Sequence, residues 1–186
     1  MTSLIHRFDD PSSIQDWHAI NDGVMGGVSF SRLRFDIGGL AVFEGEVSLL
    51  NNGGFASVRT SSLQLGRLGT VAYVLSAWGD GRTYKLNLRT DTGFDGLNYQ
   101  ASFNPVIGRW SQIELPVADF LPTFRGRVVQ GAPSLRPDLV IQVGLMIADK
   151  RAGPFRLLVR SIEAVESVSL SAAEGRHSPP HHRDHP

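Results

Sequence analysis

The feature that most constrains the fold is a period-two alternation of side chains in short runs. In residues 84–89, tyrosine and leucine alternate with lysine, asparagine and arginine, and residues 99–103 and 110–115 repeat the pattern. This period is that of a β-strand, and helical periodicity is hard to find. Glycine-rich turn signals such as Asn52-Gly53-Gly54 and Gly79-Asp80-Gly81 separate the runs. About nine or ten short strands with frequent turns predict an all-β fold, a single β-sandwich or jelly roll.

The expected domain covers residues 1–166, because the composition changes near Ser167. Residues 167–186 are rich in serine, proline and histidine and contain four of the six histidines. Such a segment cannot bury an apolar face, so we predict a disordered tail. Weak binding of zinc, nickel or copper by these histidines is the alternative, although a disordered tail offers no fixed geometry.

Composition excludes several classes of function. The chain has no cysteine among its 186 residues, so disulfides, thiolate metal sites and cysteine nucleophiles are impossible. Its 18 basic and 18 acidic side chains balance, which argues against nucleic-acid binding. The longest apolar stretches are far shorter than the about 20 residues that a membrane-spanning helix needs. With no basic segment leading into an apolar run at the N-terminus, the sequence predicts a cytoplasmic protein.

The densest motif is Asn21–Ser29, with Gly23, Gly26 and Gly27 close together. Glycines so close together indicate backbone conformations that a Cβ would forbid, or a close approach of another segment. A phosphate cradle is one interpretation, but the glycine spacing of nucleotide-binding loops is missing. An ion site built from backbone groups and Asp22 is a second, and a tight loop packed under the sandwich is a third.

A second glycine motif, Asn51–Arg59, begins with a hairpin-type Asn-Gly pair. Alternation places Phe55, Ser57 and Arg59 on one face of the strand that follows. An arginine beside a core phenylalanine needs a carboxylate, so we predict that Arg59 pairs with Asp22 or Glu44. The alternative is an arginine that points into a ligand groove.

The third cluster, residues 120–127, contains two phenylalanines, a proline and two arginines. Aromatic and arginine side chains are enriched at binding hot spots, so Phe124 and Arg125 are candidates for a partner surface. The other interpretation is a loop whose phenylalanines tuck under the sandwich edge.

Signals for catalysis are few. His6 and His18 are the only histidines of the expected domain, and no nucleophile or metalloprotease motif occurs. We therefore expect no enzyme activity, no catalytic residue, no cofactor and no bound metal. An unrecognised enzyme would need polar residues to converge in one pocket, and the best candidates are Asp22, Arg59, Asp80 and Asp149.

Several motifs together resemble the complex I intermediate-associated protein 30 (CIA30) family over residues 4–165. They are Trp17, Asn21–Ser29, Phe43-Glu44-Gly45, Asn52–Arg59, Gly79–Tyr84, Trp110, Pro116, Phe120, Phe124-Arg125-Gly126, Ile147–Lys150 and Gly153-Pro154-Phe155. The resemblance implies a galactose-binding-domain-like jelly roll. For mitochondrial members it implies a chaperone-like factor that binds an assembly intermediate of NADH:ubiquinone oxidoreductase (complex I), without being an oxidoreductase. Because this chain starts its domain without a presequence, we expect a bacterial, cytoplasmic member.

Two hypotheses of function follow. The first is a non-catalytic protein-binding domain, an assembly factor of the chaperone type, with a protein partner and no nucleic acid. Its candidate binding residues are Asn21, Asp22, Met25, Arg59, Tyr84, Phe124 and Arg125. The second is a carbohydrate-binding module, in which Trp78, Tyr84 and Tyr99 would stack on sugars unless they pack in the core.

Overall fold

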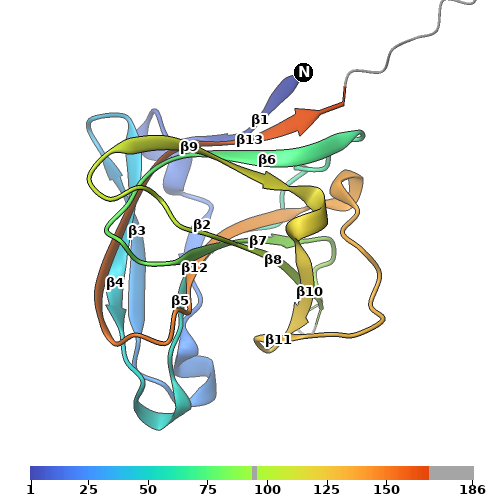
Figure 1. Ribbon diagram of the computed structural model, residues 1–186. Helices are drawn as coiled ribbons and strands as arrows, with labels where there is room; N and C mark the ends of the chain where they lie inside the picture. Colours follow the sequence, from blue (N-terminus) through green and yellow to red (C-terminus); the bar gives the residue numbers. More distant parts are fainter. Residues whose placement is uncertain (94–95, 168–186) are drawn as a thin grey trace, which may run out of the picture.

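The computed structural model describes residues 1–93 and 96–167, and it consists of two antiparallel sheets packed face to face (Figure 1). The six-stranded sheet has the order β3 (Phe30–Asp36), β4 (Leu40–Val47), β13 (Gly153–Glu166), β6 (Thr70–Trp78) and β9 (Trp110–Pro116), with β1 (Thr2–Arg7) on β13. The seven-stranded sheet has the order β11 (Arg127–Val128), β10 (Leu121–Phe124), β8 (Asn98–Phe103), β7 (Tyr84–Arg89), β12 (Gln142–Ile147), β5 (Ala56–Thr60) and β2 (Trp17–Ala19). The predicted all-β sandwich is therefore confirmed.

The helical content of the described residues is limited to short 3₁₀ turns. These are η1 (Pro11–Ile14), η2 (Asp22–Met25), η3 (Leu50–Asn52), η4 (Val117–Asp119) and η5 (Pro137–Leu139). No helix in the described part of the chain is long and apolar enough to cross a membrane. The predicted tail, residues 167–186, lies outside the described residues apart from Ser167.

The period-two pattern decides which side chains enter the core. On β7, Tyr84, Leu86 and Leu88 face the opposite sheet and are fully buried, while Lys85 and Asn87 face outward. The ring of Tyr84 lies 6.2 Å from that of Phe43 on β4, so it joins the two sheets. Burying apolar faces of both sheets against each other supplies the main stabilisation of the fold.

Two of the aromatic residues considered for sugar stacking are core residues. Tyr84 is fully buried and donates its hydroxyl hydrogen to Asp80 at 3.0 Å. Tyr99 is also buried and donates to the carbonyl of Pro133 at 3.1 Å. Trp78 lies half-buried, opposite Trp110 on the six-stranded sheet. Core packing is thus the role of Tyr84 and Tyr99.

A buried ion pair links two of the connections that cross between the sheets. Arg82, between β6 and β7, donates from Nε and Nη2 to the carboxylate of Asp149, between β12 and β13, at 2.9 and 2.6 Å. Its Nη1 donates to the carbonyls of Gly153 and Pro154, and Nη2 also donates to Arg151. Burial raises the pKa of Asp149, but hydrogen bonding and charge from Arg82 outweigh it and hold that pKa below its ordinary value.

Candidate functional site

The carboxylate of Asp22 joins the two glycine motifs that the sequence presents separately. It lies in η2, fully buried, and accepts from Ser29 N at 2.9 Å and Ser29 Oγ at 2.5 Å. It also accepts from the backbone N–H groups of Gly54 at 2.8 Å and Phe55 at 3.3 Å. Burial raises the pKa of Asp22, but these hydrogen bonds outweigh it and lower the pKa overall.

Two of the glycines are required by the space around this carboxylate. A Cβ on Gly27 would lie 2.8 Å from Cβ of Asp22, and a Cβ on Gly53 would lie 2.6 Å from its Oδ2. Both distances are shorter than side chains tolerate. The backbone amides that a phosphate would need are therefore used by the protein's own carboxylate, which favours a packed structural loop over a phosphate cradle.

Asn21, the residue before Asp22, forms a second set of hydrogen bonds at this end of the sandwich. Its Oδ1 accepts from Ser31 Oγ at 2.7 Å and from Ser57 N at 3.0 Å. The residue therefore links the end of β2 to β3 and β5. Asn21 and Asp22 together fix the geometry of this end of the sandwich, while their own polar groups are turned inward.

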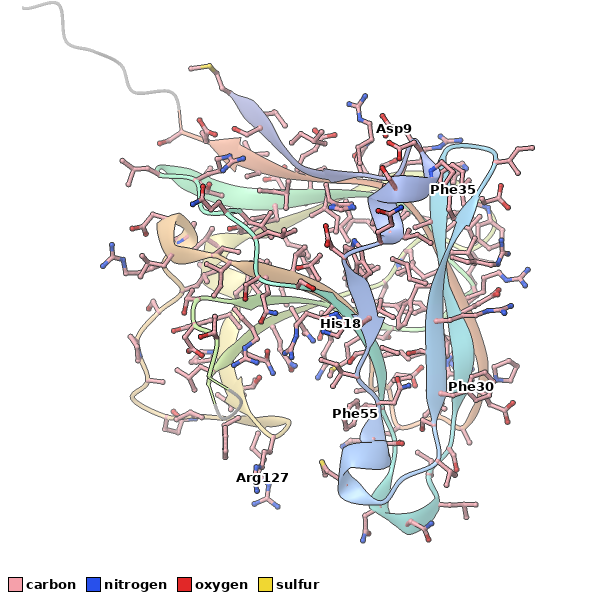
Figure 2. The ribbon with its side chains drawn as sticks, turned by 180° about the vertical axis from the view of Figure 1, so that it is seen from behind. Asp9, His18, Phe30, Phe35, Phe55 and Arg127 are labelled. Carbon is pink, nitrogen blue, oxygen red and sulfur yellow. The ribbon has the colours of Figure 1, made fainter. Side chains whose placement is uncertain are left out.

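The same two loops expose a group of large apolar side chains, here named the apolar tip. Its members are between 48% and 68% exposed, namely Met25, Val28, Phe30, Leu49 and Leu50. Val28 and Phe30 flank Ser29, whose Oγ accepts from Ser48 N at 2.9 Å, directly before Leu49. Phe30 lies near this end with its ring turned away from the sheets, and Phe55 lies beside η2 (Figure 2). Large apolar side chains exposed on loops at one end of a sandwich are candidates for an interaction surface.

Sequence reasoning identified Met25 but missed the other members of the apolar tip. Val28 and Phe30 look like ordinary strand residues in an alternating run, and Leu49-Leu50 looks like the end of a strand. The sequence signal that could have revealed the leucines is the pair Asn51-Asn52. In the structure these two residues have φ angles of 55° and 58°. Left-handed backbone at two successive residues makes a tight turn, which leaves the preceding leucines at an exposed corner.

The predicted ion pair of Arg59 is wrong. Asp22 is occupied by the loop hydrogen bonds, and Glu44 binds Arg32, Arg34 and Arg156 on the outside of the six-stranded sheet. Arg59 instead lies on the outer face of the seven-stranded sheet, where its Nε is buried without a hydrogen-bond partner. Burial, and secondarily the charge of Arg89, lowers the pKa of Arg59.

The residues considered for a catalytic pocket do not converge. Asp22 lies in η2, and Arg59 lies on β5 without contacting it. Asp80 accepts from the backbone N–H of Arg82 at 3.0 Å, and Asp149 pairs with the same residue's guanidinium. Asp149 therefore belongs to the structural ion pair described above, and Asp80 accepts structural hydrogen bonds beside it, from the hydroxyl of Tyr84 and the backbone N–H of Arg156 as well.

The third cluster divides between core and edge. Phe120 is buried, with its ring 5.5 Å from that of Tyr73. Phe124 ends β10, and the guanidinium carbon of Arg125 lies 5.1 Å from the centre of the Phe124 ring. Instead of a loop, the segment forms the β10–β11 hairpin, and Figure 2 shows Arg127 at its far end.

Of the candidate binding residues, the structure brings only Asn21, Asp22 and Met25 together, at the apolar tip. Arg59 lies on the outer face of the seven-stranded sheet, and Tyr84 lies in the core. Phe124 and Arg125 lie on the edge hairpin. A binding role for these residues stays a prediction.

Comparison with known proteins confirms the family resemblance. A family model described as "Complex I intermediate-associated protein 30 (CIA30)" matches residues 6–159. An uncharacterized protein of Schizosaccharomyces pombe is 28% identical over 175 residues, which cover 81% of this chain and 78% of that protein. A Drosophila melanogaster protein named "Complex I intermediate-associated protein 30, mitochondrial" is 25% identical and covers 84% of this chain, which spans 60% of its length.

The relatives correct the expected localisation. The Drosophila protein and a Neurospora crassa protein of the same name, 24% identical over 86% of this chain and 72% of its own length, are both named mitochondrial. The prediction of a bacterial, cytoplasmic protein is therefore wrong. That prediction depended on the N-terminal residues of the sequence alone.

Solved structures with a similar fold include carbohydrate-binding modules. The family 11 module of a Clostridium thermocellum cellulase superposes with a TM-score of 0.67 at 12% identity, over 90% of this chain and 95% of the module. The same kind of module in complex with a β-1,3-1,4-mixed-linked tetrasaccharide gives a TM-score of 0.62 at 13% identity, over 89% and 96%. At these identities the likeness shows the fold alone.

Proposed function

Because the chain belongs to the complex I intermediate-associated protein 30 family, we propose that it is a non-catalytic, chaperone-like assembly factor. Its partner would be a protein intermediate in the assembly of NADH:ubiquinone oxidoreductase, as the names of its relatives indicate. The observation that carries the proposal is the apolar tip, which offers a partner protein a defined hydrophobic surface.

The apolar tip suits protein docking because its backbone is already fixed. Asp22 binds Ser29, Gly54 and Phe55, so the segments that carry the exposed side chains are ordered before a partner arrives. A preorganised surface loses less conformational entropy on binding than a mobile loop does. Buried apolar anchors supply much of the energy of protein interfaces.

Non-catalytic action is supported by the state of the polar groups near the tip. Asp22 is fully buried, and both of its carboxylate oxygens accept hydrogen bonds from the protein. Asn21 is likewise engaged through its Oδ1. Neither group is placed to exchange a proton with a substrate, which general acid–base catalysis requires.

Carbohydrate binding, the alternative, receives less support from the described residues. The aromatic rings of Tyr84 and Tyr99 lie in the core, where no sugar can stack on them. The similarity to carbohydrate-binding modules is a similarity of fold, and function depends on the residues of the site.

The proposal is tested by placing charged residues in the apolar tip and expressing the variant in cells that lack the endogenous gene. The double variant Met25→Asp/Leu50→Asp is expected to lower the amount of assembled complex I at least about tenfold, since each anchor contributes on the order of 1–2 kcal/mol to an interface. Native gel electrophoresis with an NADH dehydrogenase activity stain measures the assembled complex. Thermal unfolding of the purified variant checks that it folds.

A matched control carries the same two charges elsewhere. Ile37 lies in the turn between β3 and β4, and Leu68 lies in the loop before β6; both are exposed. The variant Ile37→Asp/Leu68→Asp is expected to restore assembly as wild type does. The proposal would be contradicted if cells with the tip variant assembled a normal amount of complex I. It would also be contradicted if the control variant lowered that amount as much as the tip variant does.

A further inference from the structure

The outer face of the seven-stranded sheet carries polar side chains that are buried although they point away from the core. Arg89, Asn87 and Gln100 are only 4%, 7% and 8% exposed. On an open flat sheet such side chains would be solvated. The β10–β11 hairpin and the β5–β2 end lie on either side of the central strands β12, β7 and β8 (Figure 1), so the sheet curves around this face. We use the name cationic cleft for the set of polar side chains on this curved outer face, namely Arg59, Lys85, Asn87, Arg89, Asn98 and Gln100.

The strand register places a glycine in the floor of the cationic cleft, at a position too crowded for any other side chain. Gly144 on β12 lies between Arg59 on β5 and Asn87 on β7, and it pairs with both. A Cβ on Gly144 would approach the carbonyl oxygen of Val58 to 2.8 Å and Cβ of Arg59 to 3.3 Å. Glycine therefore keeps this position free of a side chain, directly between an arginine and an asparagine.

Four buried side-chain atoms in the described residues have no hydrogen-bond partner, and all four belong to this face. They are Nε of Arg59, Nε of Arg89, Oδ1 of Asn87 and Oδ1 of Asn98. An unsatisfied buried donor or acceptor costs about 1–3 kcal/mol, so a folded protein rarely keeps several together without a use. The set contains two donors that carry positive charge and two neutral acceptors.

The cationic cleft also has more positive than negative charge. Arg89 donates from Nη2 to Asp91 at 3.2 Å and to the carbonyl of Gly93. Within the described residues, neither Arg59 nor Lys85 forms an ion pair with a carboxylate; Lys85 reaches only Oε1 of Gln100, at 3.5 Å. Burial, followed by repulsion from Lys150, lowers the pKa of Lys85. A bound anion would relieve the repulsion among these cations.

We propose that the cationic cleft binds an acidic peptide segment of a partner protein. A glutamate or aspartate carboxylate would pair with the guanidinium groups of Arg59 and Arg89, and peptide N–H groups would donate to the amide oxygens of Asn87 and Asn98, once these buried side chains turn toward the peptide. The inference depends on the proposed function only in taking the partner as a protein. It concerns a surface separate from the apolar tip.

A peptide satisfies the cleft better than the other anions do. A phosphate offers oxygens to the arginines but little to the two amide oxygens, which need donors. A carboxylate joined to a peptide chain supplies acceptor and donors at once. A sugar-binding site on this face would need an exposed aromatic ring on which the sugar could stack. The rings of Tyr84 on β7 and Tyr99 on β8 face the core instead.

The test uses the whole chain and a fluorescent peptide of alternating glutamate and glycine, with the glutamine counterpart as its control. Anisotropy is expected to show saturable binding of the glutamate peptide and at least about tenfold weaker binding of the glutamine peptide, because a charged hydrogen bond contributes about 1.5–3 kcal/mol. Arg59→Gln is expected to weaken binding of the glutamate peptide by a similar factor. Arg109→Gln removes one charge from an exposed position before β9 and is expected to bind as wild type does.

Nuclear magnetic resonance of the arginine Nε–Hε groups gives a second measurement that needs no variant in the cleft. The resonances of Arg59 and Arg89 are expected to shift on addition of the glutamate peptide, and that of Arg109 to stay in place. The proposal would be overturned if Arg59→Gln bound the glutamate peptide as tightly as wild type, or if the two peptides bound equally. It would also be overturned if inorganic phosphate bound and the glutamate peptide did not. The variant Met25→Asp/Leu50→Asp is expected to bind the peptide normally, so failure at the apolar tip and failure at the cleft can be distinguished.

Discussion

Replacing Arg82 by methionine is expected to lower the free energy of unfolding by about 3–5 kcal/mol, which is the usual loss when one partner of a buried ion pair is removed. The side chains of Arg82 and Asp149 are only 7% and 6% exposed, so water cannot replace the guanidinium. Three backbone carbonyls, of Gly153, Pro154 and Arg151, lose their donor as well. These carbonyls precede or begin β13 of the six-stranded sheet, while Arg82 lies just before β7 of the seven-stranded sheet, so both sheets are affected.

Urea denaturation of Arg82→Met and of Arg32→Met measures the effect against a matched control. Arg32 also pairs with a carboxylate, Glu44, at 2.7 Å, but its side chain is 69% exposed. Its replacement is expected to cost less than about 1 kcal/mol. Similar losses for the two variants would contradict the structural role given to the Arg82–Asp149 pair.

Replacing Asp22 by alanine is expected to cost about 3–5 kcal/mol and to disorder the apolar tip, since each buried donor left without a partner costs about 1–3 kcal/mol. The donors are Ser29 N and Oγ, Gly54 N and Phe55 N. Hydrogen exchange at the amides of Gly54 and Phe55 is expected to accelerate strongly. The control Asp36→Ala removes a carboxylate that accepts only locally, from Gly38 N and Arg34, and should change stability by about 0.5 kcal/mol or less. Unchanged exchange in Asp22→Ala would contradict the account.

The pH dependence of the same interaction has a definite sign. The pKa of Asp22 in the folded state lies below its ordinary value of 3.8, so the folded protein favours the charged carboxylate. The stability that the charged Asp22 contributes is fully present above the pKa that this carboxyl has in the unfolded chain. It is lost as the pH falls through the pKa of Asp22 in the folded state. Asp22→Asn, which cannot ionise, is expected to show a flatter decline of stability below about pH 4 than wild type.

Local patterns predicted the fold because a sandwich uses them directly. Alternation at residues 84–89 placed Tyr84 and Lys85 on opposite faces of the strand, and in the structure Tyr84 faces the core and Lys85 faces outward. The strands that were missed, β1, β2, β10 and β11, lie at or near sheet edges or are short, so their pattern is weak. Their pairing depends on neighbours that are distant in sequence, which no local signal reports.

The candidate sites were harder to predict because they form between distant segments. Asp22 meets Gly54 across 32 positions, and nothing near Asp22 reveals that partner. Arg59 was assigned a carboxylate because a single buried cation requires one. The structure instead places Arg59 near another cation, Arg89, and only the strand register across Gly144 reveals that arrangement.

The central claim is that the apolar tip docks on an assembly intermediate of complex I, and site-specific photocrosslinking tests it most directly. A photoreactive amino acid at Leu50 is expected to crosslink, in intact cells of the source organism, to a complex I subunit identified by mass spectrometry. The same amino acid at Leu68, which is also exposed but lies away from the tip, is the control. Crosslinks to a complex I subunit from position 50 and not from position 68 are the result that the account predicts. Crosslinks from both positions alike, or none to any complex I subunit from position 50, would contradict it.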